Sequence, residues 1–276
     1  MGASQARQRF HAEIQKPDPD IDLGAAALYI AQEEYPELDC GAYLSRLDLM
    51  AQELRGRLPA GRYPLQVIRT LNQYLFGELN FKGNFEAYYD PRNSFLNEVM
   101  DRRTGIPITL SLVYLELAKR LGFPMAGVGM PGHFLVRPTL DEMAIFVDAF
   151  HQGEMLFEED CRDLIQQFYG QGARLQPEHL APIGPKPFLM RMLTNLKAIY
   201  LHQQDALRVL GILDRMLLLF PEAVSEQRDR GLIHYRLGNL PPAQIDLQAY
   251  LMARPDAHDA FEIRQVLSQI SRIDSP

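Results

Sequence analysis

The sequence predicts an α+β fold followed by an all-α repeat region, and three observations carry this prediction. Apolar residues recur at spacings of three and four through most of the first hundred residues, which is typical of amphipathic helices. Short runs rich in Val, Ile and Phe follow between residues 126 and 148 and are typical of antiparallel strands. Beyond residue 188 the helical spacing returns and repeats after 34 residues.

Breaks in this pattern divide the chain into four segments. Residues 1–20 read as a polar lead-in, because Pro17 and Pro19 stop any helix there. Residues 21–170 form the first domain, with a helical N-terminal part ahead of a small sheet. Clustered Gly and Pro mark residues 171–187 as a linker, and residues 188–276 hold the repeats.

One helix in the middle of the chain is especially well marked. It is expected from Pro107, a residue that suits the first helical position, to the Leu121-Gly122 stop. Its apolar residues cover nearly the whole circumference, which predicts a helix buried at the centre of the domain.

The C-terminal repeat is recognised by a matched tripeptide. Pro221-Glu222-Ala223 recurs as Pro255-Asp256-Ala257, and small and apolar residues fall where a tetratricopeptide repeat places them. We expect two repeats and a capping helix from Asp259 to Ile270. Such helix pairs bind a partner peptide or protein, or so short an array packs on the first domain; both interpretations stay open.

Composition excludes several classes of function. The 276 residues carry a net charge of -7 and a pI near 5.5, which argues against direct contact with nucleic acid. No apolar run is long enough for a signal peptide or a membrane helix, so we expect a cytoplasmic protein without membrane contact.

The sequence shows no sign of a cofactor or metal. The two cysteines, Cys40 and Cys161, lie far apart in the sequence, and the histidines are scattered without metal-ligand spacing. A glycine-rich phosphate loop is also absent from the sequence. Both thiols are expected to be inert, and for Cys161 the preceding acidic residues are expected to raise the pKa. We therefore expect no cofactor and no metal site.

The region 105–150 resembles the transglutaminase-like core, a cysteine-protease-type fold. That resemblance rests on the buried helix, its Leu121-Gly122-Phe123-Pro124 turn, and His133 and Asp148 after it. In the family, a cysteine opens the helix, whose N-terminus favours the thiolate. Here the aligned position is Pro107, which has no atom that can attack a carbonyl.

A closer resemblance covers nearly the whole chain. The runs 93–97, 102–107 and 131–137, with the repeats, look like the bacterial SirB-type family, in which tetratricopeptide repeats follow a transglutaminase-like domain. The resemblance implies a family without established activity, in which Gly-Ile-Pro is typical. Asp148-Ala149-Phe150 stands where members commonly have Asp-Pro-Phe.

The candidate site contains His133 and Asp148, as a surviving or vestigial catalytic pair. A hydroxyl could replace the thiol: Ser111 shares the helix face of Pro107 but lies about one turn deeper, and Thr109 lies nearer the helix end. We expect the Ser111 hydroxyl to bond a backbone carbonyl instead. The motifs add polar or neighbouring pocket residues, namely Asn93, Asn97, Glu98, Pro107 and Arg137.

Two functions follow from different classes. The first is a non-catalytic transglutaminase-like module, a pseudoenzyme with a regulatory or binding role, that binds a protein or peptide partner also through its repeats. The second is a hydrolase or amide-transferring enzyme that uses His133 and Asp148 with an unconventional nucleophile such as Ser111. A hydroxyl or thiol in hydrogen-bonding reach of the His133 ring separates the two.

Overall fold

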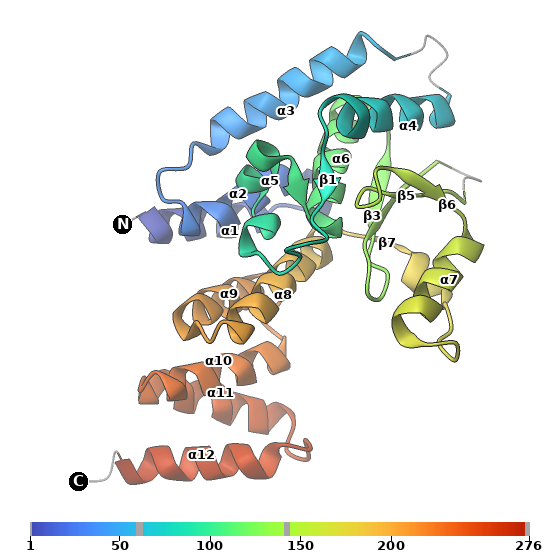
Figure 1. Cartoon of the computed structure of the whole chain (residues 1–276). Helices are drawn as coiled ribbons and strands as arrows, with labels where there is room; N and C mark the ends of the chain where they lie inside the picture. Colours follow the sequence, from blue (N-terminus) through green and yellow to red (C-terminus); the bar gives the residue numbers. More distant parts are fainter. Residues whose placement is uncertain (1, 59–62, 141–143, 274–276) are drawn as a thin grey trace. The chain divides into compact units, whose positions relative to one another are not determined.

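The computed structural model describes residues 2–58, 63–140 and 144–273 (Figure 1). Contacts between Cα atoms divide the chain into two compact units, residues 1–192 and 193–276. Across the described residues, every helix is either too short or too polar to pass through a bilayer.

The predicted helical start of the chain is confirmed. Asp22 and Asp39 accept backbone N–H bonds at the starts of α2 and α3, as N-cap residues do. The helices before the sheet are α1 (Gly2–Ile14), α2 (Leu23–Glu34), α3 (Cys40–Arg55), α4 (Pro64–Asn72) with a π-helical extension (Gln73–Glu78), α5 (Leu96–Arg102) and α6 (Pro107–Arg120).

The interpretation of residues 1–20 as a polar lead-in misses α1. Ala6, Phe10 and Ile14 recur at a spacing of four and are fully buried, and α1 packs against α2. Charged residues between them lowered the mean hydropathy and concealed this narrow apolar stripe. Pro17 ends the segment as expected, but only after a helix that belongs to the first unit.

The predicted central helix is confirmed as α6. Every residue from Pro107 to Ala118 is buried, including Glu116. The Glu116 carboxylate accepts the backbone N–H of Gly24 at the start of α2 and pairs with Arg120. Burial raises the pKa of Glu116, against the opposing effect of Arg120.

The predicted antiparallel sheet is confirmed, and it is larger than expected. The three expected strands are β3 (Met125–Val128), β4 (Leu135–Pro138) and β5 (Phe146–Asp148), which are neighbours in the order β6-β5-β4-β3-β7. The short edge strands β6 (Glu154–Leu156) and β7 (Pro182–Ile183) were not predicted. Two-residue strands β1 (Lys82–Gly83) and β2 (Thr104–Gly105) pair separately in parallel.

Residues 171–187, predicted as a linker, belong to the first unit. Within them, a 3-10 helix (Pro177–Leu180) leads into β7, which pairs with β3. The segment follows α7 (Glu158–Tyr169), and the division into units falls after Met192, inside α8 (Pro185–His202). The Gly and Pro residues of this segment form turns on either side of β7, and they do not form a linker between two domains.

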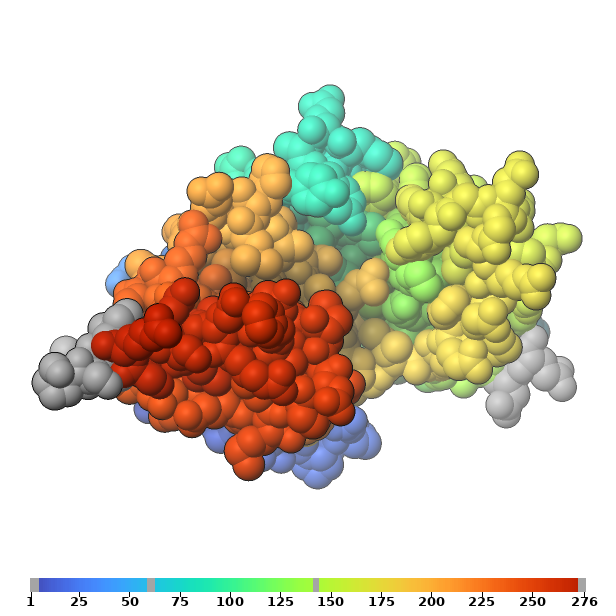
Figure 2. Space-filling model, turned by 90° about the horizontal axis from the view of Figure 1, so that it is seen from below, coloured from blue at the N-terminus to red at the C-terminus, as the bar shows by residue number. Residues whose placement is uncertain are grey.

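The second unit confirms the helical repeat. The bounds of α9 (Ala206–Leu219) and α11 (Leu240–Ala253) differ by 34 residues at both ends, since 240 − 206 and 253 − 219 are both 34. α10 (Val224–Arg236) lies between them, and the predicted capping helix is α12 (Ala260–Ile273). α12, drawn in red in Figure 2, buries Ile263 and Ile270, and its exposed side chains are polar apart from Phe261.

A turn glycine ties the sheet to the helical layer. In the loop between β5 and β6, Gly153 has a φ of 79°, and a Cβ there would lie 2.4 Å from the Asn72 side chain. Asn72 donates to the Gly153 carbonyl over 2.6 Å and accepts from the Tyr114 hydroxyl over 3.0 Å. The loop conformation therefore depends on the absence of a side chain at position 153.

We expect Gly153→Ala to lower the free energy of unfolding by about 2–4 kcal/mol, because it adds backbone strain and a clash with Asn72. Urea unfolding followed by circular dichroism measures this change. Gly172→Ala is the matched control, since a Cβ at Gly172 meets no atom within 4 Å. Equal stabilities of the two variants would contradict this role of Gly153.

Candidate functional site

Strand pairing brings His133 and Asp148 together. β4 and β5 are antiparallel with Val136 opposite Val147, so continuing the register sets residue 133 across from residue 150. A turn at Gly132, with a φ of 76°, delivers His133 ahead of β4, and its backbone N–H donates to the Met130 carbonyl. Asp148 is the last residue of β5.

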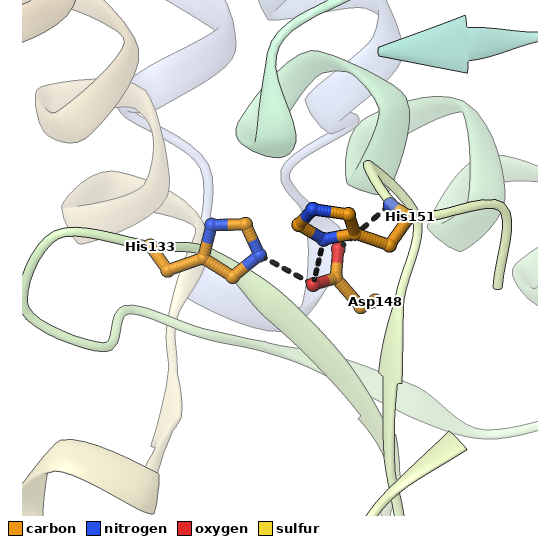
Figure 3. Close-up of side chains that lie close together, drawn as sticks. All are labelled: His133, Asp148 and His151. Atoms are coloured by element: carbon orange, nitrogen blue, oxygen red, sulfur yellow. Dashed lines mark hydrogen bonds and ion pairs between the residues drawn. The ribbon is translucent and has the colours of Figure 1, made fainter. Parts of the chain in front are cut away.

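Asp148 is the hydrogen-bonding centre of the site. Its Oδ1 accepts the backbone N–H groups of Phe150 and His151 over 2.9 and 3.2 Å. Its Oδ2 lies 2.6 Å from Nε2 of His133 and 2.8 Å from Nδ1 of His151 (Figure 3). Four groups thus hold a buried carboxylate, in keeping with the rule that buried polar atoms are hydrogen bonded.

His151 belongs to the site and was not predicted from the sequence. It follows Asp148 by three residues, in the loop after β5, and the backbone bonds to Asp148 turn its ring back onto the carboxylate. The available signal was a histidine three residues after a strand-ending aspartate. Its side chain is 41% exposed, whereas those of His133 and Asp148 are buried.

The charge state of Asp148 decides the tautomers of both rings. Burial alone would raise the pKa of Asp148, but the bonds and charges of His133 and His151 outweigh burial and lower it. An ionised carboxylate only accepts hydrogen bonds, so Nε2 of His133 and Nδ1 of His151 carry the protons. In a neutral His133 ring, Nδ1 is then the basic nitrogen.

The three residues lie in the wall of a cavity of about 770 Å³, a volume typical of ligand sites. Aromatic side chains and carboxylates dominate its lining, and none of the described lining residues is Lys or Arg. Beyond the His133, Asp148 and His151 cluster, the lining includes Phe85, Tyr88, Tyr89, Phe150 and Phe168 and the acidic residues Glu154, Asp160 and Asp163.

Pro107 lines this cavity together with His133 and Asp148. It occupies the first position of α6, so the site has the helix start that the family resemblance predicts, with proline in place of the nucleophile. In the described part of the chain, no hydroxyl or thiol forms a hydrogen bond with the His133 ring, whose bonding partner is Asp148.

The alternative nucleophiles lie away from His133. Ser111 is fully buried, is not among the cavity-lining residues, and its hydroxyl has no hydrogen-bond partner in the described residues. The expected bond from Ser111 to a backbone carbonyl is therefore wrong. Thr109 Oγ1 donates to the Asn93 carbonyl over 2.7 Å and accepts the Ile106 N–H, which secures the start of α6.

Four predicted pocket residues do not line the cavity, and this expectation is corrected. Asn93 is buried and donates to the Ala87 and Tyr88 carbonyls, so it holds the 84–93 loop together. Asn97 is buried and Glu98 half-buried in the first turn of α5. Arg137 places its guanidinium 5.3 Å from the centre of the Phe146 ring. Motif neighbours in sequence are not neighbours in the cavity.

Both cysteines are buried. Burial raises the pKa of Cys161 to about 12, with a smaller contribution from Asp160, and burial also raises the pKa of Cys40. Burial, more than the acidic run, therefore suppresses the thiolate form.

We expect Asp148→Asn to lower the free energy of unfolding by about 1–3 kcal/mol at neutral pH, because an amide cannot accept bonds on both sides as the carboxylate does. The lowered pKa of Asp148 stabilises the folded state above its unfolded pKa of about 3.9, and this contribution is lost as the pH falls through the folded value. The gap between wild type and variant should therefore shrink below about pH 4.

Urea unfolding of both proteins between pH 7 and pH 3 measures this gap. The exposed Asp20→Asn change is the control and should leave stability unchanged within about 0.5 kcal/mol. A gap that stays constant across the range would show that the Asp148 charge contributes nothing.

Comparison with known proteins places these features in a family. Residues 41–194 match the family described as the transglutaminase-like superfamily, and residues 196–268 match a tetratricopeptide repeat family. A UPF0162 protein of Xylella fastidiosa is 36% identical over 258 residues, covering 92% of each chain. A UPF0162 protein of Vibrio cholerae is 32% identical and covers 71% of this chain and 73% of its own.

A more distant relative is the human F-box only protein 21, which is 33% identical over 187 residues, 64% of this chain and 29% of that protein. No solved structure matches the chain. The match of residues 41–194 to the transglutaminase-like superfamily spans more than half of the chain, and it agrees with the resemblance to the SirB-type family. This chain therefore belongs to the transglutaminase-like superfamily, among the bacterial UPF0162 proteins.

Proposed function

We propose that this chain is a non-catalytic transglutaminase-like protein that binds a protein or peptide partner. The observation that carries the proposal is Pro107, which lines the cavity beside His133 and Asp148 where the family resemblance sets a thiol. A base with its orienting carboxylate but without a nucleophile in reach cannot form a covalent acyl intermediate.

The cavity rim supports a role in binding. Phe85 and Tyr89 are 65% and 74% exposed, and Phe168 is 47% exposed, so large apolar side chains face solvent around the cavity. Exposed aromatic groups at a concave site are typical of surfaces that anchor a partner. The repeats supply a second surface of a kind that commonly binds proteins. A regulatory role and a cytoplasmic location belong to the same proposal.

Panning a random peptide library on the purified full chain, followed by fluorescence titration of the selected peptides, tests peptide binding. We expect Phe85→Ala with Tyr89→Ala to weaken binding by roughly 10-fold or more, because truncated aromatic anchors typically cost over 1 kcal/mol. Leu49→Ala removes an apolar group on α3 that is also well exposed, and it should leave the affinity unchanged. Peptides that bind the double variant as tightly would move the contact away from the cavity.

Electrophilic probes for activated Ser, Thr and Cys test the absence of catalysis. We expect no labelling that depends on His133 in the folded protein, since Ser111, Cys40 and Cys161 are buried and Thr109 is engaged in backbone bonds. Mass spectrometry of wild type beside His133→Ala reads the labelled sites. Urea-unfolded protein is the positive control, in which both cysteines should react. A labelled hydroxyl that disappears in His133→Ala would establish an enzyme instead.

A further inference from the structure

We propose that His133, Asp148 and His151 form a binding site for a divalent first-row transition metal ion, of which zinc is the probe. The ligand atoms are Nε2 of His133, Oδ2 of Asp148 and Nδ1 of His151, which all lie within 4.8 Å of one another. Zinc and iron bind well to two imidazoles and one carboxylate, whereas magnesium and calcium favour ligand sets made of oxygen atoms alone. This site goes beyond the proposed function and does not depend on peptide binding.

The geometry needs little change to accept an ion. The two nitrogens lie 2.6 and 2.8 Å from Oδ2, whereas neighbouring ligands with bonds of about 2.1 Å stand about 3.0–3.4 Å apart. The His133 contact must therefore lengthen by about 0.4–0.8 Å and the His151 contact by about 0.2–0.6 Å for the three atoms to share one ion. His151 can provide its share, because its side chain is 41% exposed and lies in the loop between β5 and β6.

The carboxylate is held as a metal ligand should be. Oδ1 of Asp148 is engaged by the backbone N–H groups of Phe150 and His151, which directs Oδ2 toward the two rings (Figure 3). Outer hydrogen bonds of this kind orient metal-binding side chains and raise metal affinity.

Proton balance also permits binding. In the hydrogen-bonded arrangement, each ring directs an N–H at Oδ2, so each must present a lone pair instead. A neutral imidazole does this by moving its proton to the other nitrogen. In the described residues, Nδ1 of His133 and Nε2 of His151 make no hydrogen bond, so either nitrogen can take the proton without breaking one. No net proton is released when both rings are neutral.

The surroundings favour a cation and leave room for further ligands. Glu154, Asp160 and Asp163 line the same cavity of about 770 Å³, and no Lys or Arg is among its described lining residues. An ion with three protein ligands keeps at least one open coordination position, and here that position would face the cavity and could be filled by water or by a bound molecule.

Isothermal titration calorimetry of zinc binding to the full chain tests the site. Any histidine tag is removed first, and bound metal is removed from the protein with a chelator. We expect one zinc ion per chain and a loss of affinity of roughly 100-fold or more in His151→Ala, which removes a direct ligand. His258→Ala removes an exposed histidine of the second unit and should leave affinity within about 2-fold.

Cobalt supplies an independent spectroscopic readout. Wild type should develop the visible absorption of a low-coordinate cobalt site, and His151→Ala should lose it while circular dichroism shows that the variant is folded. No saturable binding, or binding that His151→Ala leaves intact, would overturn the proposal. Failure of peptide panning with intact zinc binding would overturn only the proposed function.

Discussion

The burial of α6 is the constraint on which the first unit depends. A helix whose first twelve residues are all buried has no face for solvent, so the chain must cover it on every side. α2, α3 and α5 pack against it, and so do β3 and β4 of the sheet. The helical layer and the sheet are two halves of one enclosure.

That enclosure places the start of α6 in the cavity. Thr109 bonds the Asn93 carbonyl and the Ile106 N–H, so the first turn is secured from two segments of the chain. Gly83 lies in β1, which pairs with β2 just before α6. It packs so closely on the Phe150 ring that a Cβ at position 83 would lie 2.6 Å from a ring atom. Loop, helix start and β5 hairpin are thereby held together around His133 and Asp148.

Much of this fold could be predicted from periodicity. α6 and the 34-residue repeat have strong local signals, because a buried helix and a stacked helix pair each impose a regular pattern. α1 was missed because its apolar stripe is narrow, and β6 and β7 were missed because two or three residues on a sheet edge carry no pattern. Short edge strands are defined by their partners in space.

Part of the candidate site could also be predicted from the sequence, and part could not. His133 and Asp148 were predicted from a family resemblance, and the register of β4 and β5 explains their pairing. His151 was not predictable from that resemblance, because its position depends on the loop that Gln152 and Gly153 close with positive φ angles. Asn93 and Asn97 belong to a separate family motif, and neither lines the cavity: Asn93 bonds within the 84–93 loop and Asn97 is buried in α5.

A buried carboxylate between two imidazoles is a costly way to stabilise a fold. Removing charges from water carries a penalty that well-packed apolar side chains avoid, so Asp148 is poorly explained by stability alone. One of its imidazoles, His151, also faces an open cavity and is not sealed in the core.

A cluster of this kind at a cavity wall suits the recognition of something that enters the cavity. An ion held by it would present its remaining coordination positions to the same space that the exposed aromatic side chains surround. A carbonyl or carboxylate oxygen of a bound peptide could fill one of those positions. Metal binding and partner binding would then reinforce each other, because the ion supplies a Lewis-acidic contact that Pro107 cannot.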